Sequence, residues 1–336
     1  MKVAAPPTDG PIAPAATPMF SVVVAAYQAA ETIGEAIDSA LAQTVPPDEI
    51  VVCDDGSTDD LDAALAPFRE RIVLIRQENR GEASAKNAAA RAATGDFVAI
   101  LDADDVYLPR RLEALGALAS ARPDLDLLTT DAYLEVSGRV VRRVYSGDWT
   151  FEVDDQRREI MRRNFVFGHA AVRRDRLFAV GGFDEEIRFT TDWECWMRLI
   201  LTGSGAGAVI EPLSRYRVRP TSLSADRTRM TAGRVQSLRK GLGHPSLRPE
   251  ERETALTTLA VLEREFAVLR LRDVVRTGGA DARRLALGLA FAKSAALPTR
   301  LKALAAALAP GVAGRLLRRR DRRVWRGAGE TTVERV

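Results

Sequence analysis

Residues 20–55, FSVVVAAYQAAETIGEAIDSALAQTVPPDEIVVCDD, predict a strand, a helix and a second strand in succession. The segments 20–27 and 49–55 are rich in β-branched residues, which is typical of buried strands. Between them, apolar residues recur at helical spacing from Glu31 to Gln43, and Pro46–Pro47 separate this helix from the second strand.

The alternation continues along the chain, with helices predicted over 59–69 and Glu82–Ala93 and strands over 71–77 and 97–105. These strands are too apolar for a half-exposed sheet, so we expect an α/β fold with a mostly parallel sheet flanked by helices. Ligands bind such sheets beyond the carboxyl ends of the strands. Three predicted strands end there in polar groups, namely Tyr27, Asp54–Asp55 and Asp102–Asp104–Asp105.

Beyond residue 124 the alternation weakens, with strands predicted over 124–134 and 138–145, and from about residue 226 only helices are predicted. We therefore expect a disordered, Ala- and Pro-rich leader over 1–18, an α/β domain over 19–225, and an all-helical extension over 226–336 that ends in a basic tail. No stretch reaches about 18 uninterrupted apolar residues, which argues against an integral membrane span.

The composition excludes some classes of protein. Lys and Arg number 49 against 46 Asp and Glu, so the net charge of +3 does not indicate a polyanion-binding protein. The aromatic interleaving of nucleic-acid stacking platforms is also missing, and we expect no nucleic-acid partner. Cys53 and Cys195 lie far apart in apolar segments, which favours free thiols in a reducing compartment and a cytoplasmic location.

The acids of residues 102–105 are explained by a divalent cation. Mg²⁺ and Mn²⁺ take oxygen ligands and are usually held by one or two carboxylates together with substrate phosphates. Asp104 would contact the metal, and Asp102 would reach a sugar hydroxyl or a metal-bound water. The alternative is a solvated turn in which an Asp caps a helix near Leu108–Leu112, and for Asp105 alone the cap is favoured.

Three segments together resemble family 2 glycosyltransferases of the Rossmann-like GT-A fold. They are SVVVAAYQAAETIGEAIDSALAQTVPPDEIVVCDDGSTDD, NRGEASAKNAAARAATGDFVAILDADD and GGFDEEIRFTTDWECWMRL, and they stand in the family's order and approximate spacing. The resemblance covers roughly residues 19–222. It implies a nucleotide-diphosphosugar donor and inversion at the anomeric carbon.

The resemblance also implies a nucleotide site. Tyr27 would pack near the base beside the backbone of Ala25, unless it only covers the sheet edge, and Asp55 would accept a hydrogen bond from uracil or its equivalent. Lys86 stands where the family often carries Arg, and it would contact phosphate as a point charge. Arg219 stands where many relatives carry His, and it could pair with the diphosphate but cannot ligate a cation.

By the same resemblance, Asp102 would bind ribose or support the metal, Asp104 would hold the metal against the diphosphate, and Asp192 would be the catalytic base. An inverting transfer needs one carboxylate to take the proton of the attacking hydroxyl. The alternative for Asp192 is an ordinary helix N-cap. His169, Trp193 and Glu194 are candidates for the acceptor side, each with a purely structural alternative.

The predicted function is therefore transfer of a sugar from a nucleotide-diphosphosugar, with UDP slightly favoured, to a hydroxyl of a glycan, lipid-linked or small-molecule acceptor. One alternative is a metal-dependent nucleotidyltransferase, but AAYQAAET lacks the Gly-rich phosphate loop expected after its first strand. A non-catalytic nucleotide-sugar-binding module is the other.

The C-terminal segment RLKALAAALAPGVAGRLLRRRDRRVWRG, residues 300–327, is basic and amphipathic. Such segments can lie on anionic membrane surfaces, which suits a lipid-linked acceptor and a peripheral place on the inner face of the membrane. The alternative is a helical annex that packs on the catalytic domain and has a solvated basic end.

Overall fold

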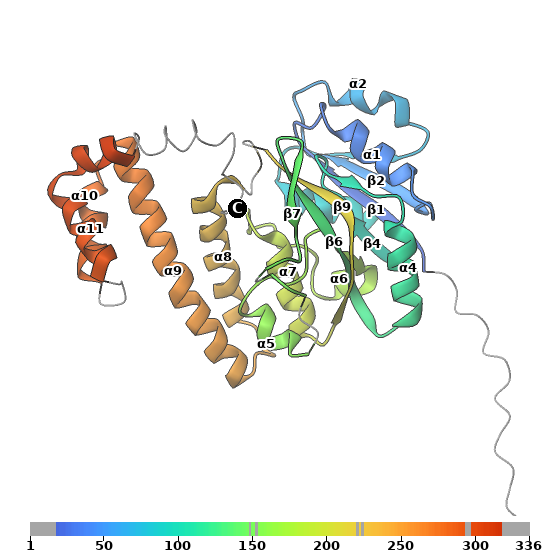
Figure 1. Ribbon diagram of the computed structural model, residues 1–336. Helices are drawn as coiled ribbons and strands as arrows, with labels where there is room; N and C mark the ends of the chain where they lie inside the picture. Colours follow the sequence, from blue (N-terminus) through green and yellow to red (C-terminus); the bar gives the residue numbers. More distant parts are fainter. Residues whose placement is uncertain are drawn as a thin grey trace, which may run out of the picture.

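The computed structural model describes residues 18–147, 149–151, 154–219, 222, 225–292 and 297–317. Its centre is one nine-stranded sheet in the order β3-β2-β1-β4-β8-β6-β9-β5, with β7 paired to β6 (Figure 1). The α/β prediction is confirmed, with helices flanking the sheet.

The first half of the sheet is parallel. It is formed by β1 (Phe20–Ala26), β2 (Glu49–Asp54), β3 (Val73–Arg76) and β4 (Phe97–Ile100). Ala26 of β1 lies opposite Asp54 of β2, and Val23 lies opposite Ile100 of β4. The carboxyl ends of these strands therefore meet at one edge of the sheet.

The second half is mixed. It comprises β5 (Val106–Tyr107), β6 (Leu125–Val136), β7 (Arg139–Arg143), β8 (Ala171–Arg173) and β9 (Gly205–Val218). Strand β8 runs antiparallel to both β4 and β6, whereas β6 and β9 are parallel. The expectation of a mostly parallel sheet thus describes β1 to β4, while β8 reverses the direction beside β4.

Helices cover both faces of the sheet because the strands alternate their apolar side chains. Val22 and Val24 point to the face covered by α1 (Ile33–Leu41), α2 (Leu61–Leu65), the 3-10 turn η1 (Ala66–Phe68) and α4 (Arg111–Ala121). Val23 points to the other face, where α3 (Glu82–Ala92), α5 (Gln156–Ile160), α6 (Arg174–Ala179) and α7 (Thr191–Leu201) pack.

The helical extension contains α8 (Arg227–Leu242), α9 (Pro249–Thr277), α10 (Ala282–Phe291) and α11 (Leu297–Leu308). Leu238 of α8 and Ala255 of α9 belong to the same core as α7. Leu271 and Val275 at the far end of α9 form a separate core with α10 and α11. In Figure 1, α10 and α11 accordingly lie at one end of α9, away from the sheet.

Some expectations fall outside the described residues, namely the disordered leader apart from Pro18, and the basic tail beyond residue 317. Both cysteines are buried and free. Among the described residues, no helix is both long and apolar enough to cross a membrane.

Candidate active site

The strand ends at the carboxyl edge bring the predicted nucleotide-binding residues together. The backbone N–H of Asp55 donates to the carbonyl of Ala26 over 2.8 Å, so the ends of β1 and β2 are joined. Tyr27 follows β1 directly and is 52% exposed, which leaves its ring open to a ligand. Ala25, two residues earlier in β1, is partly exposed.

The Asp55 carboxylate is buried and already accepts three hydrogen bonds. The donors are the side chain of Gln77 at 2.7 Å and the backbone N–H groups of Arg80 and Gly81 at 2.9 and 2.8 Å. A carboxylate has about four acceptor positions, so about one remains for a nucleotide base. Asp55 therefore also fixes the loop that leads into α3.

Gln28 joins the loops after β1 and β2, and the sequence did not single it out. Its φ angle is +52°, and its side-chain oxygen accepts from the backbone N–H groups of Thr58 and Asp59 at 2.8 and 3.0 Å. Its own N–H donates to Ser57 Oγ over 3.1 Å. No periodicity marks such a residue, because its partners lie about 30 positions away.

The acidic segment lies in a loop, because β4 ends at Ile100 and β5 begins at Val106. The favoured interpretation of Asp105 as a helix cap is wrong. Its side chain is buried at 1% exposure, and it accepts from the backbone N–H of Arg217 over 2.7 Å. The same carboxylate lies 2.6 Å from Nε2 of His169, so Asp105 connects the loop to β9 and to the segment before β8.

Lys86 supports the acids rather than presenting a free charge. Its ammonium group is buried, lies 3.0 Å from the carboxylate of Asp102, and also pairs with Glu82. Burial raises the pKa of Asp102, but Lys86 and His169 outweigh burial and hold that pKa well below its usual value. Two carboxylates thus engage two of the three N–H donors of the Lys86 ammonium group, which leaves about one for a phosphate.

Asp104 is the acid whose charge is least compensated. Burial, together with the charges of Asp105 and Asp102, raises the pKa of Asp104 to about 7. No side-chain hydrogen bond or ion pair satisfies its carboxylate within the described part of the chain. A divalent cation would relieve this repulsion, so the donor set fits one.

A group of possible metal ligands lies at the same place. Ligand atoms of Asp102, Asp105 and His169 lie within 4.8 Å of one another. Asp105 and His169 already contact each other and are buried, whereas the side chain of Asp102 is 33% exposed. Asp102 and Asp104 are therefore the residues of this loop that would hold a cation.

His169 is buried beneath the acids, at 1% exposure. Its Nδ1 lies 3.2 Å from Ser214 Oγ, and its Nε2 faces Asp105 and Asp102. Burial lowers the pKa of His169, but the two carboxylates outweigh burial and raise it. This placement supports the structural interpretation of His169, which holds the acidic loop and is not open to an acceptor.

Asp192 is the second residue of α7, and the N-cap of this helix is Thr190. The interpretation of Asp192 as an N-cap is therefore wrong. Its Oδ2 accepts a hydrogen bond from Asn164 Nδ2 over 2.8 Å. A Cβ built on Gly168 would lie 3.3 Å from the same oxygen, and the next residue, His169, reaches the acidic loop. Asp192 therefore lies beside Gly168, and the next residue along the chain, His169, contacts Asp102 and Asp105.

Burial raises the pKa of Asp192, and the backbone N–H of Trp193 and the charge of Lys86 only partly offset it. A raised pKa suits a general base, because its conjugate acid then forms more readily. Asn164 was not identified from the sequence, since NFVFGHAA carries no spacing that points to Asp192.

Trp193 and Glu194 do not lie where an acceptor could touch them. Trp193 is 3% exposed, and its indole N–H donates to the carbonyl of Ile160 over 2.8 Å. Glu194 is equally buried and forms an ion pair with Arg198 at 2.7 Å. Both are buried where α7 packs against α5 and α8.

Arg219 follows β9 and lies near the acidic loop. Its charge lowers the pKa of Asp104, but burial and the charges of Asp105 and Asp102 raise that pKa by more. Its backbone N–H donates to Ser222 Oγ over 3.0 Å. Within the described residues its guanidinium group forms no ion pair. Arg219 thus places a cationic side chain near the acids of residues 102–105.

Arg111 is a buried cation that the sequence did not reveal. It is fully buried, lies over the ring of Tyr107 at 4.6 Å, and donates to Thr130 Oγ1 and to the carbonyl of His169. The sequence predicted a helix near Leu108–Leu112, and an Arg side chain at the start of a helix is normally solvated. Arg111 therefore fixes the backbone of His169 from below.

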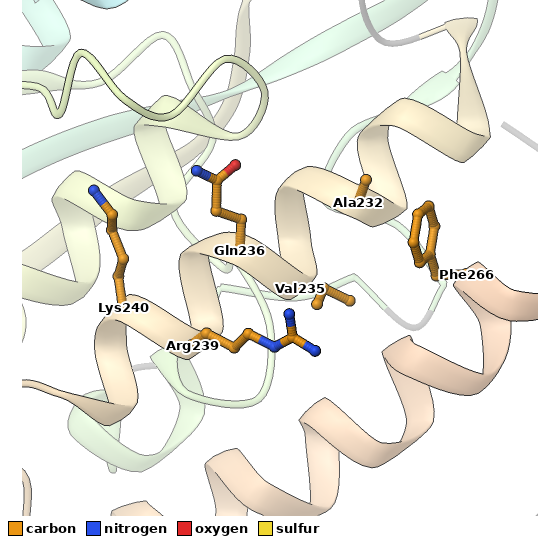
Figure 2. A pocket seen from close by; sticks show the side chains of 6 residues that line it. All are labelled: Ala232, Val235, Gln236, Arg239, Lys240 and Phe266. Atoms are coloured by element: carbon orange, nitrogen blue, oxygen red, sulfur yellow. The ribbon is translucent and has the colours of Figure 1, made fainter.

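A groove of about 360 Å³ lies elsewhere, between α8 and α9 (Figure 2). It is lined by Ala232, Val235, Gln236, Arg239, Lys240 and Phe266. None of the site residues described above contributes to it.

Several known proteins are similar to this chain. The model of the family described as "Glycosyl transferase family 2" matches residues 21–180. An "Uncharacterized glycosyltransferase" of Rickettsia prowazekii is 27% identical over 193 residues, which are 56% of this chain and 60% of the relative. The "Succinoglycan biosynthesis protein ExoO" of Rhizobium meliloti is 31% identical over 223 residues, 62% of this chain and 63% of the relative. The chain thus spans less than two thirds of either relative.

Two solved structures share the fold. S. aureus TarS 1-349 in complex with UDP-GlcNAc has a TM-score of 0.62 at 17% sequence identity. The match covers 86% of this chain and 91% of the TarS chain. The mannosyltransferase PcManGT from Pyrobaculum calidifontis, in complex with GDP-Man and Mn²⁺, has a TM-score of 0.58 at 24% sequence identity. The match covers 93% of this chain and 82% of the PcManGT chain. The expected GT-A fold is thereby confirmed.

Proposed function

We propose that the protein is an inverting glycosyltransferase, because the model of the family described as "Glycosyl transferase family 2" matches residues 21–180. It transfers a sugar from a nucleotide-diphosphosugar to a hydroxyl group of a glycan, a lipid-linked acceptor or a small molecule. The observation that carries the proposal is the position of Asp192 beside Gly168, next to His169, which contacts the acids Asp102 and Asp105.

Asp192 is the general base of this reaction. Its carboxylate takes the proton of the acceptor hydroxyl as the oxygen attacks the anomeric carbon, and the bond from that carbon to the diphosphate breaks. The sugar is transferred in one displacement, which inverts the configuration, and the nucleotide diphosphate leaves. Asn164 holds the carboxylate by a hydrogen bond of 2.8 Å to Oδ2.

Asp104 and Asp102 would hold Mg²⁺ or Mn²⁺ against the donor diphosphate. The cation supplies charge neutralisation for the leaving diphosphate, so no general acid is needed. Lys86 and His169 keep Asp102 ionised and in place. Arg219 contacts the diphosphate as a second cationic group, in keeping with its charge near Asp104.

The nucleotide lies at the ends of β1 and β2. Tyr27 packs on the base beside the backbone of Ala25, and Asp55 offers its remaining acceptor position to a base N–H group. A UDP-sugar is the favoured donor, since TarS shares the fold and binds UDP-GlcNAc. PcManGT, with GDP-Man, makes a GDP-sugar the first competitor to test.

A donor screen tests the proposal. Release of nucleotide diphosphate is measured with Mn²⁺ or Mg²⁺ for the wild type and for Asp192→Asn, with donor binding followed separately by calorimetry. We expect transfer by the wild type, and binding without transfer by the variant. Full transfer by Asp192→Asn would reassign the base, and binding without any turnover by the wild type would indicate a non-catalytic module.

A further inference from the structure

Helix α11 presents its leucines to solvent and packs alanines inward. The inward residues, which contact α10 and the end of α9, are Ala303, Ala306 and Ala307. The outward residues have exposed fractions from 38% to 77% and are Leu297, Leu301, Leu304 and Leu308. A helix that only needs to pack on its own chain buries its large apolar residues first.

The outward leucines form one continuous stripe. Their spacing of four, three and four residues places them on the same side of the helix. Val312 and Leu316, in the helical residues that follow, are 47% and 61% exposed. Phe291, at the end of α10, is 71% exposed. Solvent-exposed apolar residues thus gather on this end of the molecule, which lies away from the sheet in Figure 1.

The charge of the same segment has one sign. Between Ala282 and Leu317 the sequence has six basic residues and no acidic residue. Arg283, Lys302 and Arg315 are exposed among them. Apolar side chains flanked only by cations match the two parts of an anionic lipid surface, the acyl boundary and the headgroups.

We propose that α10 and α11 bind an anionic membrane surface by inserting this leucine stripe into the headgroup boundary. The helices lie in the interface rather than across it, since no described helix can cross a membrane. A second copy of the chain is a poorer occupant, because two-fold packing would bring the same cations face to face. Membrane binding by these helices is separate from the proposed sugar transfer and needs no catalysis.

Vesicle flotation of the full chain tests the proposal, with phosphatidylcholine vesicles compared with mixed phosphatidylcholine and phosphatidylglycerol vesicles. We expect binding to the mixed vesicles that weakens as salt rises from about 0.1 to 1 M, where the screening length falls from about 10 to 3 Å. The triple variant Leu301→Ser, Leu304→Ser, Leu308→Ser should lose at least about a hundredfold in partition. Each of Arg283→Gln, Lys302→Gln and Arg315→Gln should lose about fivefold.

The matched control changes exposed apolar residues on α9, Leu256→Ser and Val261→Ser, which are 53% and 51% exposed. It should bind vesicles as the wild type does. Equal partition of wild type and triple variant, or equal binding to both kinds of vesicle, would overturn the proposal. So would a dimer in light scattering that depends on the same leucines without any vesicle binding. Nucleotide-release activity on a soluble acceptor stays unchanged in the triple variant, which separates this inference from the proposed function.

Discussion

Asn164 donates a hydrogen bond from Nδ2 to Oδ2 of Asp192 over 2.8 Å, and it does so across 28 residues of chain. This hydrogen bond orients the carboxylate of the proposed base. Asn164→Ala should lower kcat about tenfold or more, because hydrogen bonds to charged groups contribute about 1.5–3 kcal/mol, and should leave donor binding unchanged.

The control for this prediction is Gln43→Ala, which removes the side-chain amide of a buried residue. Gln43 donates to the carbonyl of Leu108 over 2.9 Å and does not contact Asp192. It should lower stability in urea melts without changing kcat. An equal loss of kcat in both variants would show that the effect of Asn164→Ala is only structural.

Asp192→Asn should stabilise the protein at neutral pH while it abolishes transfer. Because burial raises the pKa of Asp192 in the folded chain, the folded state binds this proton more tightly than the unfolded chain, whose Asp pKa is about 3.9. The wild-type free energy of unfolding therefore falls as the pH rises through these two values. The advantage of the neutral Asn should be largest at neutral pH and vanish in acid, as thermal melts across pH can show. The kcat of the wild type should fall as acid protonates the base.

Asp104→Asn should weaken Mn²⁺ binding by about tenfold or more, measured by calorimetry with the donor present. Without metal, the same variant should be more stable than the wild type, because burial, Asp105 and Asp102 all disfavour the Asp104 charge. Asp54→Asn serves as the control, because Asp54 accepts from the Ser57 N–H at 2.9 Å and holds a turn. Unchanged metal affinity in Asp104→Asn would remove Asp104 from the metal site.

Gly168→Ala should lower kcat strongly and the free energy of unfolding only slightly. The added Cβ would lie 3.3 Å from Oδ2 of Asp192, so the carboxylate must shift by a few tenths of an ångström. Small displacements of a reacting group have large effects on rate. Gly116→Ala in α4 is the control, since its Cβ meets only Phe20 at 3.8 Å, and it should stabilise the helix by about 0.5–1 kcal/mol. Full activity of Gly168→Ala would show that Asp192 tolerates the shift.

Lys86→Met should destabilise the fold by about 3 kcal/mol, because it leaves the Asp102 charge without its buried partner. Lys240→Met is the comparison. Lys240 also pairs with two acids, Asp184 and Glu186, but is half-buried at the surface, so its loss should lower the free energy of unfolding by about 1 kcal/mol or less. Similar losses in urea melts would mean that solvent compensates Asp102 as well.

Much of the fold could be predicted because its signals are local. β-Branched runs and helical spacing marked β1 to β4 and the helices between them. The predicted strands over 124–134 and 138–145 correspond to β6 and β7. The antiparallel insertion of β8 between β4 and β6 was not predictable, since a three-residue strand carries no period and its partners lie 43 or more positions away in register.

The strand–helix alternation, the acids after the strands and the motifs that resemble one family can all be identified in the sequence. Which polar groups pair with one another depends on the three-dimensional fold. Asp105 is committed to His169 and Arg217, Lys86 to Glu82 and Asp102, and Trp193 to the core. The reason is that burial forces each charge or N–H group to find a partner, and these partners come from strands and helices far apart in the chain. Helix periodicity likewise shows that α11 is amphipathic, but only its packing shows that the leucines face outward.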